Sequence, residues 1–151
     1  MPTYRTASEE ATIALGEQLA RGLPRQRVVL LIGNLGAGKT TMAKGIVRGL
    51  GAAEPEDVSS PTFTLIHEYG TEGRVYHIDL YRLDEASQVA TLGLDEIFER
   101  DAVVLIEWGE RFPQLLPAER TEIRIRTVAN DGSENEEREI EVTEIEIREL
   151  S

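Results

Sequence analysis

The chain has 151 residues, enough for one buried core, and its hydrophobic share of 40% with mixed charges is typical of a globular protein. It contains no cysteine, which excludes disulfides and thiolate–metal sites. No stretch reaches the roughly 18 apolar residues of a membrane span, and the first residues lack the apolar core of a signal peptide. We therefore expect a cytoplasmic protein, without a membrane partner, that forms a single domain over residues 1–151.

The net charge of −12 comes entirely from the second half of the chain. Residues 1–75 hold eight Lys/Arg and eight Asp/Glu, whereas residues 76–151 hold eight Lys/Arg against twenty Asp/Glu. Such an acidic half is repelled by a phosphate backbone, because unspecific nucleic-acid affinity comes mainly from cationic contacts. Two interpretations stay open: the charge keeps the protein soluble, or it forms a face that docks onto a basic partner.

The first half of the chain predicts the start of an α/β fold. Ser8-Glu9-Glu10 opens a helix with apolar residues at helical spacing, which ends near Gly22 and Pro24. The aliphatic run Arg27–Ile32 predicts a strand buried on both faces, and Lys39–Leu50 predicts a helix after a glycine-rich turn. The order strand, glycine turn, helix is typical of α/β domains.

The second half predicts further strands and short helices. Two strands, Phe63–Tyr69 and Arg74–Leu80, are expected to form a hairpin through a turn at residues 70–73. The alternation of apolar and charged residues near the C-terminus predicts a second, antiparallel hairpin with one wet face at a sheet edge. We thus expect a single P-loop NTPase domain with a mixed central sheet flanked by helices. The predicted elements of the second half, after the first hairpin, are helices near Asp84–Ala90 and Asp95–Arg100, a buried strand Ala102–Ile106, and a C-terminal hairpin that carries Ile123, Ile125, Ile140 and Val142 around the turn Asn130-Asp131-Gly132.

The clearest motif is a phosphate-binding loop, or P-loop, which comprises Gly33, Asn34, Leu35, Gly36, Ala37, Gly38, Lys39 and Thr40. Its glycines let backbone N–H groups turn inward around a phosphate, where a Cβ would block the approach. Lys39 offsets the charge of the β- and γ-phosphates, Thr40 offers a hydroxyl to Mg²⁺, and the following helix points its positive end at the phosphates. The motif predicts binding of a nucleoside triphosphate with Mg²⁺.

A P-loop protein also needs a carboxylate near the metal, usually at the end of a neighbouring buried strand. Glu107 and Asp79 each end such a strand, and the pattern alone does not choose between them. The segment Ser60-Pro61-Thr62-Phe63-Thr64 is either an ordinary turn or a switch that senses the γ-phosphate. Trp108 either stacks on a base or packs in the interior, while His77 is expected to be a structural strand residue.

Four motifs follow one another along the chain: residues 33–41 (GNLGAGKTT, which adds Thr41 to the P-loop), 60–65 (SPTFTL), 77–83 (HIDLYRL) and 106–108 (IEW). In this order they resemble the motifs of the bacterial TsaE family, the ATPases of tRNA threonylcarbamoyladenosine (t6A) biosynthesis. The resemblance covers residues from about 8 to 142 and also includes a Gly-Leu-Asp-Glu stretch at residues 93–96.

The resemblance implies specific roles for individual residues. Glu107 and Thr40 would be the Mg²⁺ ligands, and Asp79 would orient the attacking water or support the metal shell. Ser60, Thr62 and Thr64 would form the switch. Further nucleotide contacts are implied for Glu9, Thr41, Trp108 and Arg138.

The resemblance also implies partners and an activity. The family acts with the TsaD–TsaB pair, which transfers a threonylcarbamoyl group to adenosine 37 of tRNAs that decode codons beginning with A. We therefore expect a Mg²⁺-dependent ATPase, slow alone, that binds TsaD and TsaB and meets tRNA only indirectly. Arg82 is the internal candidate for an arginine finger. A small-molecule kinase is the alternative, whereas a regulatory GTPase would normally carry an Asn-Lys-x-Asp motif, which this sequence lacks.

Overall fold

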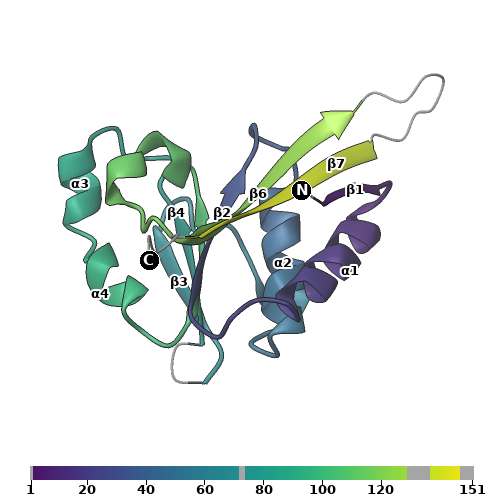
Figure 1. Ribbon diagram of the computed structural model, residues 1–151, viewed down its shortest axis with the longest axis horizontal. Coiled ribbons are helices and arrows are strands. Elements are labelled where there is room, and N and C mark those ends of the chain that lie inside the picture. The colour runs from purple at the N-terminus through teal and green to yellow at the C-terminus, as the bar shows by residue number, and fades with distance from the viewer. Residues whose placement is uncertain (1, 72–73, 129–136, 147–151) are drawn as a thin grey trace, which may run out of the picture.

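A mixed sheet of seven strands, in the order β1-β7-β6-β2-β5-β4-β3, forms the centre of the molecule in the computed structural model (Figure 1). The structure describes residues 2–71, 74–128 and 137–146. The strands are β1 (Thr3–Thr6), β2 (Arg27–Ile32), β3 (Ile66–Tyr69), β4 (Val75–Asp79), β5 (Val103–Glu107), β6 (Arg120–Val128) and β7 (Glu137–Ile145). The helices are α1 (Glu9–Ala20), α2 (Lys39–Gly49), α3 (Ala86–Ala90) and α4 (Leu94–Phe98), with 3₁₀ turns η1 (Pro55–Asp57), η2 (Gly109–Arg111) and η3 (Pro113–Leu115).

The middle of the sheet is parallel and its margins are antiparallel. β2 pairs in parallel with both β5 and β6, and β5 pairs in parallel with β4. The hairpins β6–β7 and β3–β4, and the pair β1–β7, are antiparallel. Because β2, β4 and β5 run in the same direction, their carboxyl ends meet at one edge, where open α/β sheets bind ligands.

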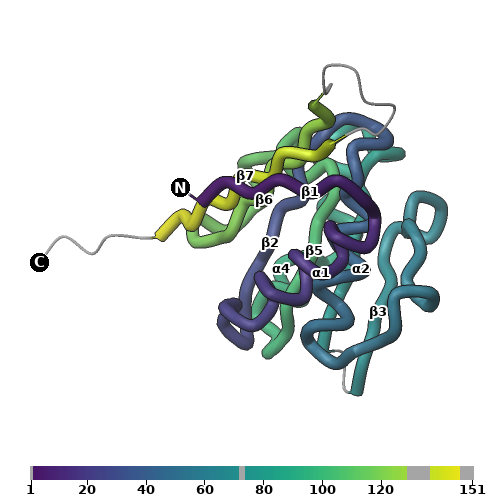
Figure 2. Tube along the Cα trace, turned by 90° about the vertical axis from the view of Figure 1, so that its right-hand side faces the viewer, coloured from purple at the N-terminus to yellow at the C-terminus, as the bar shows by residue number. Residues whose placement is uncertain are grey.

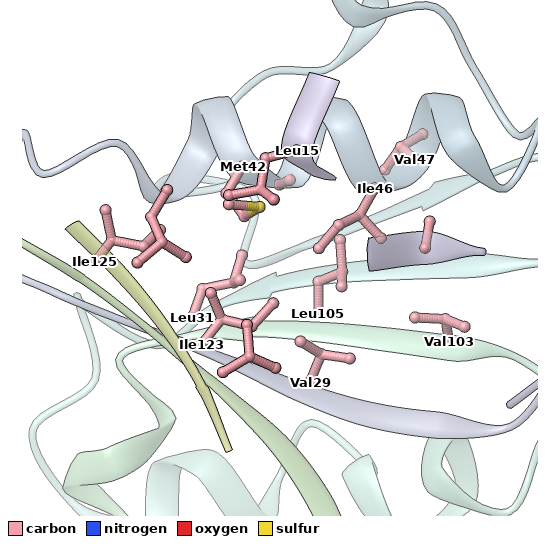
Figure 3. Packing of buried hydrophobic residues seen from close by; sticks show 14 of the residues in the cluster. Leu15, Val29, Leu31, Met42, Ile46, Val47, Val103, Leu105, Ile123 and Ile125 are labelled. Carbon is pink, nitrogen blue, oxygen red and sulfur yellow. The ribbon is translucent and has the colours of Figure 1, made fainter. Parts of the chain in front are cut away.

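Helices cover the two faces of the sheet and bury alternate residues of the central strands. Val29 and Leu31 of β2 pack toward α1 and α2 with Leu15, Met42 and Ile46, as Figure 3 shows. Val28 and Leu30 of the same strand join the opposite cluster, which includes residues of α3 and α4. This two-sided burial explains the unbroken aliphatic run of β2.

Helices α1 and α2 lie side by side on one face of the sheet. Ser8 caps α1 because its side-chain Oγ accepts a hydrogen bond of 3.0 Å from the backbone N–H of Ala11. Gly16 and Gly45 lie where the helices meet, and a Cβ added at Gly45 would come within 2.2 Å of the Ile13 carbonyl oxygen. The close contact fixes α2, and hence the loop before it, against α1.

Among the described residues, the helices are too short or too polar to span a membrane.

The structure corrects two expectations at the margins of the sheet. The C-terminal hairpin is not at the edge, because β1, which the sequence did not predict, pairs with β7 outside it (Figure 2). The first hairpin begins at Ile66 rather than Phe63, because Leu65 takes a left-handed φ of 71° and interrupts the extended chain. The predicted turn Asn130-Asp131-Gly132 lies outside the described residues.

Candidate active site

The glycine-rich loop lies between β2 and α2, at the carboxyl edge of the parallel strands. Gly38 directly precedes α2 and has a φ of 108°, a backbone conformation that residues with a side chain rarely adopt. A Cβ at Gly33 would lie 2.5 Å from the carbonyl oxygen of Ile125, so β6 also leaves no room there. The motif's glycines are therefore required by the backbone path.

A cavity of about 380 Å³ opens beside this loop. It collects side chains from α1, the loop, α2, the segment before β3, the ends of β4 and β5, and β7. The lining residues that the sequence analysis had assigned to the site are Glu9, Leu35, Gly36, Gly38, Lys39, Thr40, Thr41, Ser60, Thr62, Asp79, Glu107, Trp108 and Arg138.

Four of the assigned residues do not line this cavity. Ala37 packs into the core, while Gly33 and Asn34 face a separate groove along β6. Thr64 is exposed, and its hydroxyl lies 2.7 Å from Nε2 of His67 rather than at the cavity. Within the predicted switch, Ser60 and Thr62 therefore line the cavity and Thr64 does not.

Lys39 is held at the cavity floor by the loop that it follows. Its Nζ donates a 2.8 Å hydrogen bond to the Gly33 carbonyl and lies 3.6 Å from the ring centroid of Trp108. Burial lowers the pKa of Lys39, and the carboxylates of Glu107, Glu110 and Asp79 oppose that shift. Lys39 is therefore a buried cation at the cavity whose hydrogen-bond donors a phosphate group can accept from.

Glu107 of β5 and Thr40 of α2 both line the cavity and contact each other. Their Oε2 and Oγ1 atoms are 3.4 Å apart, and Glu107 is only 3% exposed. No group of three His, Asp or Glu side chains in residues 2–71, 74–128 and 137–146 could hold a metal by itself. A hydroxyl and one carboxylate suit Mg²⁺, which keeps several waters and takes further oxygens from phosphates.

Asp79 instead holds the segment before β3. Its Oδ2 accepts a hydrogen bond of 2.9 Å from the Thr62 hydroxyl and lies 3.4 Å from Ser60 Oγ, while Oδ1 accepts 2.9 Å from the backbone N–H of Tyr81. The two hydroxyls lie 2.7 Å from each other. Glu107 and Asp79 thus have different partners: one faces the P-loop threonine and the other faces the predicted switch.

Two arginines proposed from the sequence lie in different places. Arg138 of β7 lines the cavity and donates a 3.4 Å hydrogen bond to the carbonyl of Gly36. Arg82 is exposed, and it donates 3.2 Å to the carbonyl of Phe63 while its guanidinium lies over the Phe63 ring. Arg138, and not Arg82, is therefore the arginine at the P-loop among the described residues.

Three features of this region were not predicted from the sequence: one residue that lines the cavity and two that interact with its lining residues. Tyr81 lines it with its ring 5.2 Å from that of Trp108. Burial raises the pKa of Glu110, whose Oε2 has no hydrogen-bond partner among the described residues. His77, taken as structural, forms a 2.6 Å hydrogen bond to Glu107. The alternation along β4 signalled this position, because residues 77 and 79 lie on the same face.

Backbone strain concentrates at the same edge. Among the described non-glycine residues, positive φ angles occur at Leu65, with 71°, and at Trp108, with 66°. Leu65 precedes β3 and Trp108 follows β5. Such conformations persist where the surrounding structure holds them in place, often at functional sites.

The fold and the cavity define a class: α/β proteins with a glycine loop, a buried lysine and strand-end carboxylates around one pocket at the carboxyl edge of parallel strands. Residues 6–140 match the family model for the threonylcarbamoyl adenosine biosynthesis protein TsaE. The chain belongs to the TsaE family.

Individual relatives are similar to this chain over most of its length. The Bacillus subtilis tRNA threonylcarbamoyladenosine biosynthesis protein TsaE is 41% identical over 144 residues, which cover 94% of this chain and 85% of that protein. The Treponema pallidum protein of the same name is 38% identical over 84% of this chain and 93% of its own length. The crystal structure of Bacillus subtilis YdiB aligns with a TM-score of 0.74 at 36% identity, covering 96% of this chain and 86% of that one.

Proposed function

We propose that this protein binds Mg²⁺–ATP in the cavity beside the P-loop and hydrolyses it in the service of tRNA threonylcarbamoyladenosine biosynthesis. The observation that carries the proposal is the convergence of Lys39, Thr40, Asp79 and Glu107 on one cavity behind a glycine loop. The second half of the proposal rests on the TsaE family and on the names of its relatives.

Each residue at the cavity has a task that its position supports. Backbone N–H groups at the start of α2 and the Lys39 ammonium bind the β- and γ-phosphates. Thr40 and Glu107 would hold Mg²⁺, which neutralises phosphate charge and lowers the barrier to γ-phosphoryl transfer. Asp79 lies beside Ser60 and Thr62, where it can orient the attacking water.

The nucleoside is bound on the aromatic side of the cavity. The Trp108 ring is the aromatic surface there, and Tyr81 extends it. Glu9 at the first turn of α1 offers a carboxylate that can accept hydrogen bonds from a ribose or an amino group. Arg138 adds a cation at the loop that holds the phosphates.

We further propose that TsaD and TsaB dock at this cavity. Leu35 and Phe63, which are 67% and 82% exposed, belong to the P-loop and to the segment before β3. Exposed large apolar side chains beside a binding site are typical of a surface that a protein partner covers. The acidic half of the chain suits a pair that is basic enough to hold tRNA, so that tRNA is met only through the partners.

The test is ATP hydrolysis by the purified protein, alone and with the TsaD–TsaB pair from the same source. We expect slow turnover alone and a clear rise with the pair, because an arginine supplied by a partner can be worth about 10³–10⁵ in rate. Lys39→Ala and Glu107→Ala should abolish turnover without unfolding. Turnover that ignores the pair but rises with a small acceptor would favour a kinase, and Mg²⁺-dependent turnover in Glu107→Ala would move the metal to Asp79.

A further inference from the structure

His77 is a buried polar side chain that the roles above leave unused. It is fully buried in the middle of β4, among the largest side chains of the core. Its Nε2 lies 2.6 Å from Oε2 of Glu107 on the neighbouring strand. Burying an imidazole costs free energy unless its polar atoms are hydrogen-bonded, and the bond to Glu107 offsets part of that cost.

The geometry assigns the proton of this hydrogen bond. Nδ1 of His77 has no hydrogen-bond partner among the described residues. A proton on Nδ1 would therefore be a buried donor without an acceptor, which is rare in folded proteins. The Nε2–H tautomer avoids that cost and points its donor at a carboxylate oxygen, which can only accept when ionised.

The same oxygen of Glu107 faces the P-loop. In the part of the chain that the structure describes, Oε2 has two hydrogen-bond partners: His77 Nε2 at 2.6 Å and the Thr40 hydroxyl at 3.4 Å. In the parallel register Asp79 lies opposite Glu107, so His77 reaches Glu107 diagonally from two residues earlier on the same face. The short bond fixes one oxygen of Glu107 from below, on the side away from the cavity opening.

We propose that His77 is a positioning residue that orients the Glu107 carboxylate for Mg²⁺. The inference rests on the proposed role of Glu107 as a metal ligand. Hydrogen bonds to ligating carboxylates restrict their rotation, and their loss typically weakens metal affinity about 10–100-fold. His77 itself touches neither the nucleotide nor the metal.

Two substitutions separate the hydrogen bond from simple packing. The amide nitrogen of Gln is as many bonds from Cα as Nε2 of histidine, whereas that of Asn is as near as Nδ1 and falls short of Glu107. His77→Gln therefore keeps a donor at the required reach, and His77→Asn loses it. Ile78→Val, on the opposite face of β4 and equally buried, controls for a disturbed strand.

The probe is Mn²⁺, whose binding in the presence of a non-hydrolysable ATP analogue is followed by electron paramagnetic resonance. We expect His77→Asn to weaken Mn²⁺ binding about 10–100-fold and His77→Gln to stay within about 3-fold of the wild type. When a chelator removes the metal, both variants should bind the ATP analogue as tightly as the wild type does. A folded His77→Asn protein with wild-type Mn²⁺ affinity, or an equal loss in both variants, would overturn the inference.

A second measurement needs no substitution. The chain has two histidines, so nitrogen NMR of the imidazole rings gives few signals to assign. We expect an Nε2–H tautomer at His77, and an Nε2 resonance that shifts when Mg²⁺ is added to the nucleotide complex. An unmoved His77 signal would overturn the inference. Nucleotide binding by the wild type that is indifferent to Mg²⁺ and Mn²⁺ would instead remove the proposed function on which it rests.

Discussion

Asp79→Asn tests whether the two strand-end carboxylates, Asp79 and Glu107, have different roles. The substitution keeps the shape of the side chain and removes its charge. Oδ1 can still accept from the backbone N–H of Tyr81, which lies 2.9 Å away. The amide nitrogen replaces the oxygen that now accepts from Thr62 at 2.9 Å and lies 3.4 Å from Ser60.

The effect on stability follows from these contacts. Two hydrogen bonds to a charged acceptor, about 1.5–3 kcal/mol each, become neutral ones of about 0.5–1.5 kcal/mol. The hydroxyls of Ser60 and Thr62 can turn to accept from the new amide, because they already bond to each other at 2.7 Å. We expect a net loss of about 2–3 kcal/mol, or roughly 4–12 °C in Tm for a domain of this size.

The effect on turnover should be much larger than the effect on binding. A residue that orients or deprotonates the attacking water contributes about 10²–10⁴ in rate. Single-turnover hydrolysis of radiolabelled ATP, with the partner pair present, should slow by that factor, while ATP affinity changes less than about 10-fold. Asp84→Asn, an exposed acid outside the cavity, is the control. Wild-type turnover in a folded Asp79→Asn protein, or an equal loss of ATP binding, would refute this role.

Three further predictions concern packing, charge and a spectroscopic signal. Gly45→Ala should lower stability by about 1–3 kcal/mol in thermal denaturation, because the new Cβ would lie 2.2 Å from the backbone of Ile13. In the control Gly22→Ala, the new Cβ would be 3.7 Å from its nearest neighbour, so the change should be close to neutral. Equal effects of the two substitutions would contradict the close contact between α1 and α2. Glu110→Gln should raise Tm at pH 8 but not at pH 4. Burial raises the pKa of Glu110 above its ordinary value of 4.5, so the carboxyl keeps its proton to higher pH in the folded protein than in the unfolded chain. The wild type therefore loses stability as the pH rises above 4.5, and the neutral Gln side chain does not. A Tm difference that is the same at both pH values would contradict this reason. Adding ATP should change the emission of the single tryptophan, because the Lys39 ammonium 3.6 Å from the Trp108 ring would turn toward the phosphates, and unchanged emission at saturation would contradict that movement.

The sequence predicted most of the central fold because its signals were local. The aliphatic run of β2, the glycine loop and the start of α2 each follow from neighbouring residues, and the structure has them where expected. β1 gave no comparable signal: it has four residues, and only Thr6 is buried. Its place is set by backbone pairing with β7, a partner more than a hundred residues away. The edge position expected for the C-terminal hairpin was wrong for that reason.

The candidate site divides in the same way. The P-loop and the strand-end acids could be predicted because each is tied to an element that the pattern identifies. The partners of those acids could not: the pattern left Glu107 and Asp79 equivalent, whereas the structure gives Thr40 to one and Ser60 with Thr62 to the other. Such pairings depend on strand order and register, which a single sequence does not contain.

Strand register explains why these contacts occur together. Leu31 of β2 and Asp79 of β4 both lie opposite Glu107 of β5, so the three parallel strands end at the same level. A residue two positions before that level on the same face lies directly beneath the acids, and this is the position of His77. Arg138 approaches from the other side because β7 pairs with β6, which pairs with β2. One alignment of strands therefore brings the two acids to the same level, puts His77 beneath Glu107 and places Arg138 at the P-loop.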